Sequence, residues 1–458
     1  MKRPNIIFVF ADQLRYSAVG CCGNDTVRTP HFDRLATEGI ALENAYSACP
    51  LCAPYRAQVL SGLYSHQNGV VCNEYRLRTD IPTLADCLSE AGYETGYIGK
   101  WHLGRGPYPV EKRYGFAEMT AYNICGDGYT GSYHRNEEGP FPFTKWLPEQ
   151  ETDFALDFIE RRSNEEPPFF LMLSWIPPHW PYHTFPGAYN TYRPQDMRLP
   201  PNVPAAMYRF EQEETALYYG NVSALDAQMG RIQQKLDELG IAEDTILIFT
   251  SDHGDHLGAH GYGKPRDQWL HHTKRASKAT PYEDSVHIPF LLRYPRAVAP
   301  ETRNKAFFNS VDVMPTLLGM CGVPIPHGLA GHDLSFVFRG EEGTSPDSVY
   351  LQILGEGWPN RGPWVGFWRG VRTENYTYAR WLGNEVGPLL FDRQDDPYEL
   401  NNRYGKPGYE EIQRQLETRL QQWMRETADP FDYGERDPKS RMLLIGQEFA
   451  DPEFWAHR

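Results

Sequence analysis

Two cysteines stand among prolines and an arginine between residues 49 and 62. Cys52, Pro54 and Arg56 are spaced two residues apart, and a helical pattern can begin at Arg56. Because proline fixes its own φ and biases the preceding residue toward extended backbone, we expect Cys52 to lie outside the helix, at its N-terminal mouth. Free N–H groups and the positive end of the helix dipole would there acidify a thiol and attract an anion. The segment suggests a reactive cysteine at an anion site, and a half-buried structural cysteine is the alternative.

Acidic residues with an amide or imidazole neighbour follow two apolar, β-rich runs of the chain. Asp12 and Gln13 come directly after residues 5–10, and Asp252 and His253 come after residues 245–250. Such runs are typical of strands that are buried on both faces of a parallel sheet. Ligands collect outside the carboxyl ends of these strands, so Asp12 and Gln13 are well placed for a site, and Asp252 and His253 suit a divalent cation that prefers oxygen ligands. For Asp12, capping of a turn is an equally good interpretation.

Further basic and imidazole side chains lie close to three other expected strands. Lys100 and His102 follow residues 94–98, His179 follows residues 169–174, and Lys278 precedes residues 288–293. On extended backbone, Lys100 and His102 would project to the same side because they are two residues apart. Glycines beside them permit close backbone approach, which favours a site over a solvated strand end. His179 stands among prolines and aromatic rings, where stacking is the alternative.

Strands and helices alternate along the chain up to about residue 344. The residue patterns predict helices at 29–39, 83–91, 151–161, 211–239 and 311–322, and strands at 5–10, 41–45, 94–98, 169–174, 245–250 and 288–293. These elements indicate an α/β fold with a large mixed, mostly parallel sheet that is flanked by helices. Residues 108–150 are rich in Gly, Tyr and Pro, and we expect them to form a long loop layer over the site.

The pattern of expected elements changes from about residue 345. Short strands separated by turns are expected at 349–353, 370–372, 376–381 and 389–392, as in a meander, and an amphipathic helix at 409–427. That helix can cover one side of a smaller antiparallel sheet. We therefore predict a catalytic domain over residues 1–344 and a C-terminal α+β subdomain over residues 345–458.

Composition limits the classes of partner and the compartment. The 458 residues carry a formal net charge of -15, which argues against binding to nucleic acid or to an anionic membrane surface. No apolar run approaches the length of a membrane span, and the run at residues 6–10 is too short for a signal peptide. The eight cysteines lack the spacing of a disulfide scaffold. We expect a cytoplasmic protein with reduced cysteines, or a periplasmic or secreted one if a leader was removed.

The segment Cys52-x-Pro54-x-Arg56 resembles the signature of the type I sulfatases, in which the cysteine is oxidised after translation to formylglycine. The polar residues named above also occur in the order found in the sulfatase branch of the alkaline phosphatase superfamily. This likeness extends from the first strand to residues 390–401, which resemble the family's C-terminal signature. The resemblance implies an alkaline phosphatase-like fold and hydrolysis of sulfate monoesters. Aromatic residues that could stack on a sugar favour a carbohydrate as the substrate.

The resemblance also implies a cation site. Calcium, or alternatively Mg²⁺, would be held by Asp12, Gln13, Asp252, His253 and the modified Cys52. The implied partners are a sulfated small molecule or saccharide and the formylglycine-generating enzyme that matures the protein.

Roles in the reaction follow from the same resemblance. The hydrate of formylglycine at position 52 would attack sulfur, while Lys100 and Lys278 neutralise the sulfate oxygens. His179 would protonate the leaving alcohol, and His102 would take the proton of the second hydroxyl so that sulfate is expelled. Arg56 resembles the family's structural anchor. Lys264 and Lys274 are rivals of Lys278, and Lys264 is the closer one.

Two features keep other functions open. Many sulfatases carry a second acid and an Asn where this chain has Gln13 and His253, and the same variation occurs in phosphonate monoester hydrolases. A phosphonate or phosphate ester hydrolase is therefore the first alternative, and a non-catalytic anion-binding relative is the second.

Trp180, Trp358 and Trp364 could stack on a sugar, although aromatic residues make up 14% of the chain and are abundant everywhere.

Overall fold

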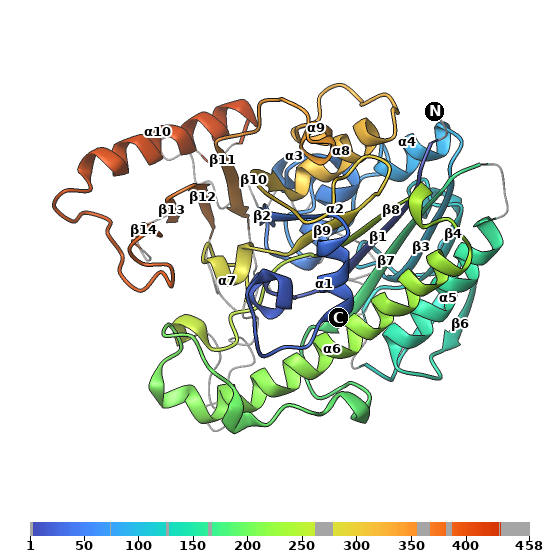
Figure 1. The fold of residues 1–458 in the computed structure, drawn as a ribbon. Helices are drawn as coiled ribbons and strands as arrows, with labels where there is room; N and C mark the ends of the chain where they lie inside the picture. Colours follow the sequence, from blue (N-terminus) through green and yellow to red (C-terminus); the bar gives the residue numbers. More distant parts are fainter. Residues whose placement is uncertain are drawn as a thin grey trace.

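The computed structural model describes the chain except residues 1–2, 74, 125–127, 164–166, 262–277, 355–366, 382–386, 430 and 432–458. Figure 1 shows a large central sheet with helices packed against it and a smaller sheet to one side. Among the helices of these described residues, none combines the length and apolar character that crossing a lipid bilayer requires.

The large sheet has ten strands in the order β10-β2-β9-β8-β1-β7-β3-β4-β5-β6. Their bounds are Asn5–Asp12 (β1), Ile40–Tyr46 (β2), Glu94–Lys100 (β3), Glu118–Tyr122 (β4), Ser132–Arg135 (β5), Glu138–Pro142 (β6), Phe169–Pro178 (β7), Thr245–Ser251 (β8), Phe290–Arg293 (β9) and Thr302–Asn309 (β10). Strand β1 pairs in parallel with β7 and β8, and β3 pairs in parallel with β7 and β4. Strand β9 is antiparallel to β2 and β8. The sheet is therefore mixed and mostly parallel, as predicted.

Strand β1 lies at the centre because it is apolar on both faces. Ile6, Phe8 and Phe10 enter one core cluster, whereas Ile7 and Val9 enter the other. On one face α1 (Pro30–Thr37), α5 (Leu147–Ser163) and α6 (Tyr208–Glu238) cover the sheet, and on the other α2 (Cys52–Ser61), α4 (Leu84–Glu90) and α8 (Val313–Met320) do so. The described residues also form the short helices α3 (Ser65–Asn68), α7 (Glu283–Val286) and α9 (Ser335–Arg339).

A four-stranded antiparallel meander forms the smaller sheet. It runs β11 (Ser348–Ile353), β12 (Trp368–Thr373), β13 (Tyr376–Trp381) and β14 (Leu389–Asp392), in sequence order. Helix α10 (Glu410–Glu426) packs its buried Leu416, Leu420 and Trp423 against residues of this sheet. The predicted fold class is confirmed, while the division of the chain between residues 344 and 345 stays a prediction.

The expectation of a loop layer at residues 108–150 is wrong in part. Strands β4, β5 and β6 lie within this region and extend the large sheet at one edge. Strand β4 pairs in parallel with β3, and the hairpin of β5 and β6 continues from it. The sequence pattern did not predict these strands because glycine and proline are usually depleted in sheets. The edge of a sheet tolerates both residues.

The expectation that Cys52 lies outside the helix is also wrong. Leu51 is the extended cap residue, with φ -141° and ψ 143°, and Cys52 is the first residue of α2. Pro54 is accommodated because the N–H groups of the first turn have no partner inside the helix. The cysteine therefore lies within the first turn, at the positive end of the helix dipole.

Candidate active site

Four buried side chains from three distant segments meet at the carboxyl ends of the central strands. Asp12 ends β1, Asp252 and His253 follow β8, and Cys52 begins α2. One ligand atom of each lies within 4.8 Å of the others. We call these four residues the ligand cluster. The structure thus brings together residues that were predicted as metal ligands from separate parts of the sequence.

The thiol of Cys52 is in contact with acidic and basic groups at once. Its Sγ atom lies 3.5 Å from Asp12 Oδ1, 3.4 Å from His253 Nε2 and 3.2 Å from Lys278 Nζ. Cys52 is only 1% exposed. A nucleophile formed at this position would face a carboxylate, an imidazole and an ammonium group without intervening bulk water.

Asp12 is held by two cations on one of its oxygens. Lys100 Nζ lies 2.6 Å from Asp12 Oδ2, and Arg56 Nη2 lies 3.1 Å from the same atom. Burial alone would raise the pKa of Asp12, but Lys100 and the other nearby cations hold this pKa well below its usual value. Asp12 therefore stays ionised and keeps Oδ1 directed toward Cys52.

Arg56 lies one turn into α2 and connects that helix to the sheet. Its Nη1 donates to Tyr97 Oη at 3.2 Å, to Ser174 Oγ at 2.7 Å and to the backbone carbonyl of Lys100. Its guanidinium carbon lies 4.8 Å from the ring centroid of Phe10. Arg56 thereby reaches β1, β3 and β7, and this arrangement is compatible with the anchoring role expected for it.

Gln13 and Asp252 lie next to each other in the site. Gln13 has φ 69°, in the left-handed region, and its N–H donates to Asp252 Oδ1 at 2.8 Å. Burial, and then repulsion from Asp12, raises the pKa of Asp252 to about 7. Asp252 is thus a carboxylate that a further positive charge would stabilise in its ionised form.

The donor atoms of the cluster fit a divalent cation. Asp252 Oδ2 is buried and has no hydrogen bond within the part of the chain that the structure describes. His253 Nδ1 lies 3.0 Å from the carbonyl oxygen of Gly254, so Nδ1 carries the proton and Nε2 presents a lone pair to the cluster. A thiolate beside these ligands suits a soft ion such as Zn²⁺. With an oxygen ligand in place of the Cys52 sulfur, the set suits Ca²⁺ or Mg²⁺ better.

Lys278 enters the cluster from the segment that precedes α7. Its Nζ lies 3.2 Å from Gln13 Oε1 and 3.4 Å from His253 Nε2, and the residue is 6% exposed. Its rivals Lys264 and Lys274, like Trp358 and Trp364, lie outside the described residues. The position of Lys278 is the one that an anion-binding lysine would need, since its ammonium adjoins the Cys52 thiol.

His102 is placed differently from the expectation of an extended segment. Its φ is 57°, so Lys100 and His102 are not related by simple strand alternation. His102 Nδ1 is buried without a hydrogen bond to any described residue. Burial and the neighbouring Lys100 and Arg56 cations lower the pKa of His102 well below its usual value. The ring is therefore neutral and able to accept a proton.

His179 follows β7 and forms a hydrogen bond with the backbone of the next residue. Its Nδ1 lies 2.7 Å from the carbonyl oxygen of Trp180, so Nδ1 carries a proton and leaves Nε2 for another partner. Burial, and then the ammonium of Lys278, lowers the pKa of His179 to about 3. Trp180 beside it is 41% exposed.

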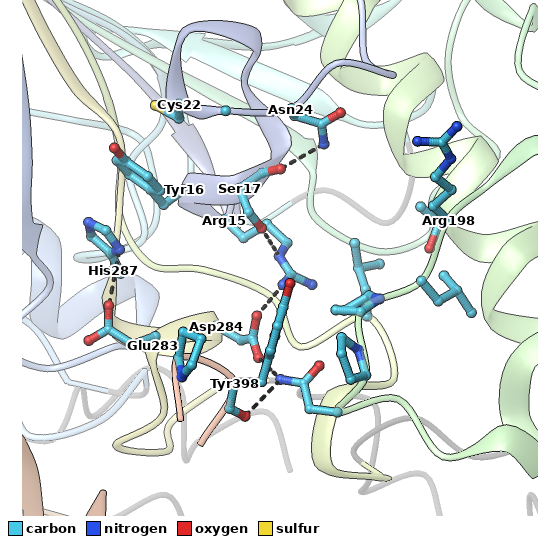
Figure 2. Close-up of a pocket in the computed structure, with 18 of the residues that line it drawn as sticks. Arg15, Tyr16, Ser17, Cys22, Asn24, Arg198, Glu283, Asp284, His287 and Tyr398 are labelled. Carbon is cyan, nitrogen blue, oxygen red and sulfur yellow. Dashed lines mark hydrogen bonds and ion pairs between the residues drawn. The ribbon is translucent and has the colours of Figure 1, made fainter. Parts of the chain in front are cut away.

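A cavity of about 560 Å³ adjoins the segments that carry Gln13 and Lys278. Figure 2 shows Arg15 on one wall in an ion pair with Asp284, and Asn202 Nδ2 donates to Asp284 Oδ2 at 3.0 Å. None of the residues of the ligand cluster is among the described residues that line it. The Arg15–Asp284 pair ties the exit of β1 to the chain that follows Lys278, and so helps to hold both segments in place.

Three buried polar residues near the cluster were not assigned a role from the sequence. Asp255 lies three residues after Asp252, and its position after β8 could have indicated that it belongs near the site. Tyr182 and Glu151 gave no signal, because a tyrosine in a proline-rich turn and a glutamate in an amphipathic helix are ordinarily exposed. Glu151 is 1% exposed, and Tyr122 Oη donates to its Oε1 at 2.7 Å.

Replacing Glu151 with glutamine should make the protein less sensitive to high pH. Burial raises the pKa of Glu151 to about 8, above its value in the unfolded chain. The folded state therefore favours the protonated carboxyl, and stability is lost as the pH rises from about 4.5 to 8. The variant does not titrate, so its free energy of unfolding relative to wild type should rise over this range, by at most about 5 kcal/mol.

Thermal melting of Glu151→Gln and wild type at pH 5 and pH 9 would measure this difference. Glu160→Gln is the matched control, because Glu160 lies on the same helix with its side chain 62% exposed. Equal pH dependence in Glu151→Gln and wild type would contradict the raised pKa.

Two family models and several known proteins match the chain. The family model named Sulfatase matches residues 4–323, and the model named N-sulphoglucosamine sulphohydrolase, C-terminal, matches residues 273–426. The Ulvan-active sulfatase of Formosa agariphila is 31% identical over 464 residues, which cover 99% of this chain and 87% of that protein.

Two further relatives cover almost all of the chain. The N-acetylglucosamine-6-O-sulfatase of Bacteroides thetaiotaomicron is 28% identical over 529 residues, with 97% of this chain and 90% of that protein covered. The crystal structure of a protein assigned as the sulfatase yidJ of Bacteroides fragilis superposes with a TM-score of 0.83 at 29% identity. That superposition covers 94% of this chain and 97% of the other.

Proposed function

The chain belongs to the sulfatase family and is a sulfuric ester hydrolase, and from this premise we propose that it removes sulfate from a saccharide with a formylglycine made from Cys52. The observation that carries the proposal is the environment of that residue. Its Sγ lies within 3.5 Å of Asp12, His253 and Lys278, which come from segments far apart in the sequence.

The charges around Cys52 suit a sulfate ester. The oxygens of a sulfate monoester repel nucleophiles, so a catalyst must neutralise them while the bond to the leaving alcohol breaks. Lys278 and Lys100 would supply two positive charges. Asp12, Gln13, Asp252 and His253 would hold Ca²⁺ or Mg²⁺, which when bound withdraws charge from the sulfate oxygens. Formylglycine supplies, as its hydrate, a hydroxyl that can act as the nucleophile.

The two histidines suit opposite proton transfers. His102 is neutral and buried, with Nδ1 lacking a hydrogen bond to the described residues, so it can accept a proton. His179 presents Nε2, because Nδ1 is engaged by the Trp180 carbonyl oxygen. An anionic sulfate close to His179 would offset the effect of Lys278 and raise its pKa, and so allow it to protonate the leaving alcohol.

A saccharide is the favoured substrate class because of the relatives and the exposed aromatic surface. The N-acetylglucosamine-6-O-sulfatase, which matches 97% of the chain, carries a sugar in its name. Trp180 directly follows His179 and is 41% exposed, so its indole could stack on a sugar ring whose ester oxygen receives the proton.

The test is a substrate comparison with protein that has been coexpressed with the formylglycine-generating enzyme. We expect kcat/KM for at least one sulfated mono- or oligosaccharide to exceed kcat/KM for an aryl sulfate. A panel of sulfated sugars would also reveal the sulfate position. Equal or lower values for every sugar in the panel would contradict the saccharide assignment.

The alternative that the sequence resemblance of Gln13 and His253 implies is a phosphonate or phosphate ester hydrolase. An aryl phosphonate monoester should therefore be included in the comparison. A kcat/KM for the phosphonate above that for all sulfate esters would overturn the proposed substrate class, whereas a much lower value would exclude the alternative.

A further inference from the structure

Asp255 is a fully buried carboxylate that adjoins the ligand cluster without belonging to it. Gln13 Nε2 donates to Asp255 Oδ2 at 2.6 Å, and Tyr182 Oη donates to the same oxygen. The backbone N–H of Leu257 donates to Asp255 Oδ1 at 2.9 Å. Both carboxylate oxygens therefore act as acceptors, and all three contacts come from donors.

This arrangement decides which end of the Gln13 amide faces the cluster. The two ends of an amide have nearly the same shape, but one is an NH₂ donor and the other is a carbonyl acceptor. The hydrogen bond to Asp255 Oδ2 comes from the NH₂ of Gln13, which is the donor end of the amide. Gln13 Oε1 then points in the other direction, where it lies 3.2 Å from Lys278 Nζ.

Tyr182 extends the same contact to the segment that carries His179. It stands three residues after His179, and its backbone carbonyl accepts a hydrogen bond from Asn221 of α6. Asp255 Oδ2 therefore joins three parts of the site: the end of β1, the loop after β7 and the loop after β8.

We propose that Asp255 is a positioning residue that turns the carbonyl oxygen of Gln13 toward the cation. The proposal rests on the proposed function in one respect only, namely that the cluster holds a divalent cation. A glutamate at position 13 would present an oxygen in either orientation, whereas a glutamine does so only when a partner selects the orientation. In this chain Asp255 is that partner.

Exchange of the amide and the carboxylate tests the proposal directly. In Gln13→Glu, two buried carboxylates would face each other, and the affinity for the cation should fall. In Asp255→Asn, the NH₂ of the new asparagine must face either the NH₂ of Gln13 or the N–H of Leu257, both of which are donors. The side chain at position 255 then no longer fixes the orientation of Gln13. In the double variant Q13E/D255N the donor and the acceptor are exchanged, the total charge is that of wild type, and an oxygen again faces the cluster.

The measurement is the Ca²⁺ affinity of the full chain by calorimetry, together with melting of the cation-free protein. Each single substitution should weaken Ca²⁺ binding by about 10-fold to 100-fold, and the double variant should recover most of this loss. Asp226→Asn is the matched control: Asp226 is equally buried, but it accepts from the N–H groups of His31 and Phe32 on α1. It should alter melting without altering Ca²⁺ affinity.

The outcomes separate this inference from the proposed function. If wild type hydrolyses sulfate esters while D255N binds Ca²⁺ as tightly as wild type, the inference is overturned and the function stands. If wild type binds Ca²⁺ and the double variant restores binding but no sulfate ester is turned over, the inference stands and the function falls. Absence of Ca²⁺ binding in wild type, or affinity losses that simply add in the double variant, would refute the positioning role.

Discussion

Cys52→Ala should abolish sulfate ester hydrolysis, with a fall in kcat on the order of 10⁴-fold or more. Removal of the nucleophile lowers kcat by this much because the sulfated intermediate can no longer form, and the remaining charged groups cannot replace it. The expectation is specific to position 52, where the side chain contacts Asp12, His253 and Lys278. Initial rates with a sulfated sugar or an aryl sulfate would measure it.

The matched control for this prediction is Cys49→Ala. Cys49 is also buried and lies three residues before Cys52, but it packs in an apolar cluster that contains no residue of the ligand cluster. Its substitution should leave most of the activity intact. Peptide mass spectrometry completes the test, since formylglycine is about 18 Da lighter than cysteine by composition. An active C52A protein, or an active wild type that lacks the mass change, would show that the nucleophile has been misassigned.

Asp252→Asn should reduce kcat/KM by about 10³-fold and weaken Ca²⁺ binding. The substitution keeps an oxygen that can accept from the Gln13 N–H, so the backbone contact is retained. It removes, however, the carboxylate whose Oδ2 has no hydrogen bond from the described residues. Asp12 Oδ2 is engaged by Lys100 and Arg56, so Asp12 has only Oδ1 directed toward the cluster.

Titration of activity with Ca²⁺ after chelation would test the Asp252 prediction. Wild type should lose activity on treatment with a chelator and regain it when Ca²⁺ is returned. The variant should need far more Ca²⁺ and recover less activity. Cation-free melting should change little or rise, because neutralising Asp252 removes its repulsion from Asp12. Unchanged Ca²⁺ dependence in the variant would place the cation elsewhere.

The sequence was sufficient for the fold class and for the members of the ligand cluster. The apolar run at residues 5–10 is the core of β1, and its two faces enter two different cores as an uninterrupted apolar strand must. Asp12, Asp252 and His253 could be placed together because parallel strands deliver their carboxyl ends to one edge of a sheet, whereas Cys52 joined them through the resemblance of its segment to the sulfatase signature. The strand inferences depend on periodicity and chain direction, which are local properties.

Local patterns failed where a distant partner decided the conformation. Cys52 joins the helix because the first turn tolerates Pro54, and strands β4 to β6 form because an existing sheet edge accepts them. His102 adopts φ 57° between Lys100 and the following loop, which strand alternation could not foresee.

The orientation of Gln13 shows most clearly what the sequence determines and what the tertiary structure decides. The sequence by itself determined that an amide follows β1, and that an acid follows β8 three residues beyond Asp252. Only the tertiary structure decided that these two residues, 242 positions apart, share a hydrogen bond. The physical reason is that a residue's type sets what its side chain can donate or accept, whereas packing of remote segments sets which partner it meets.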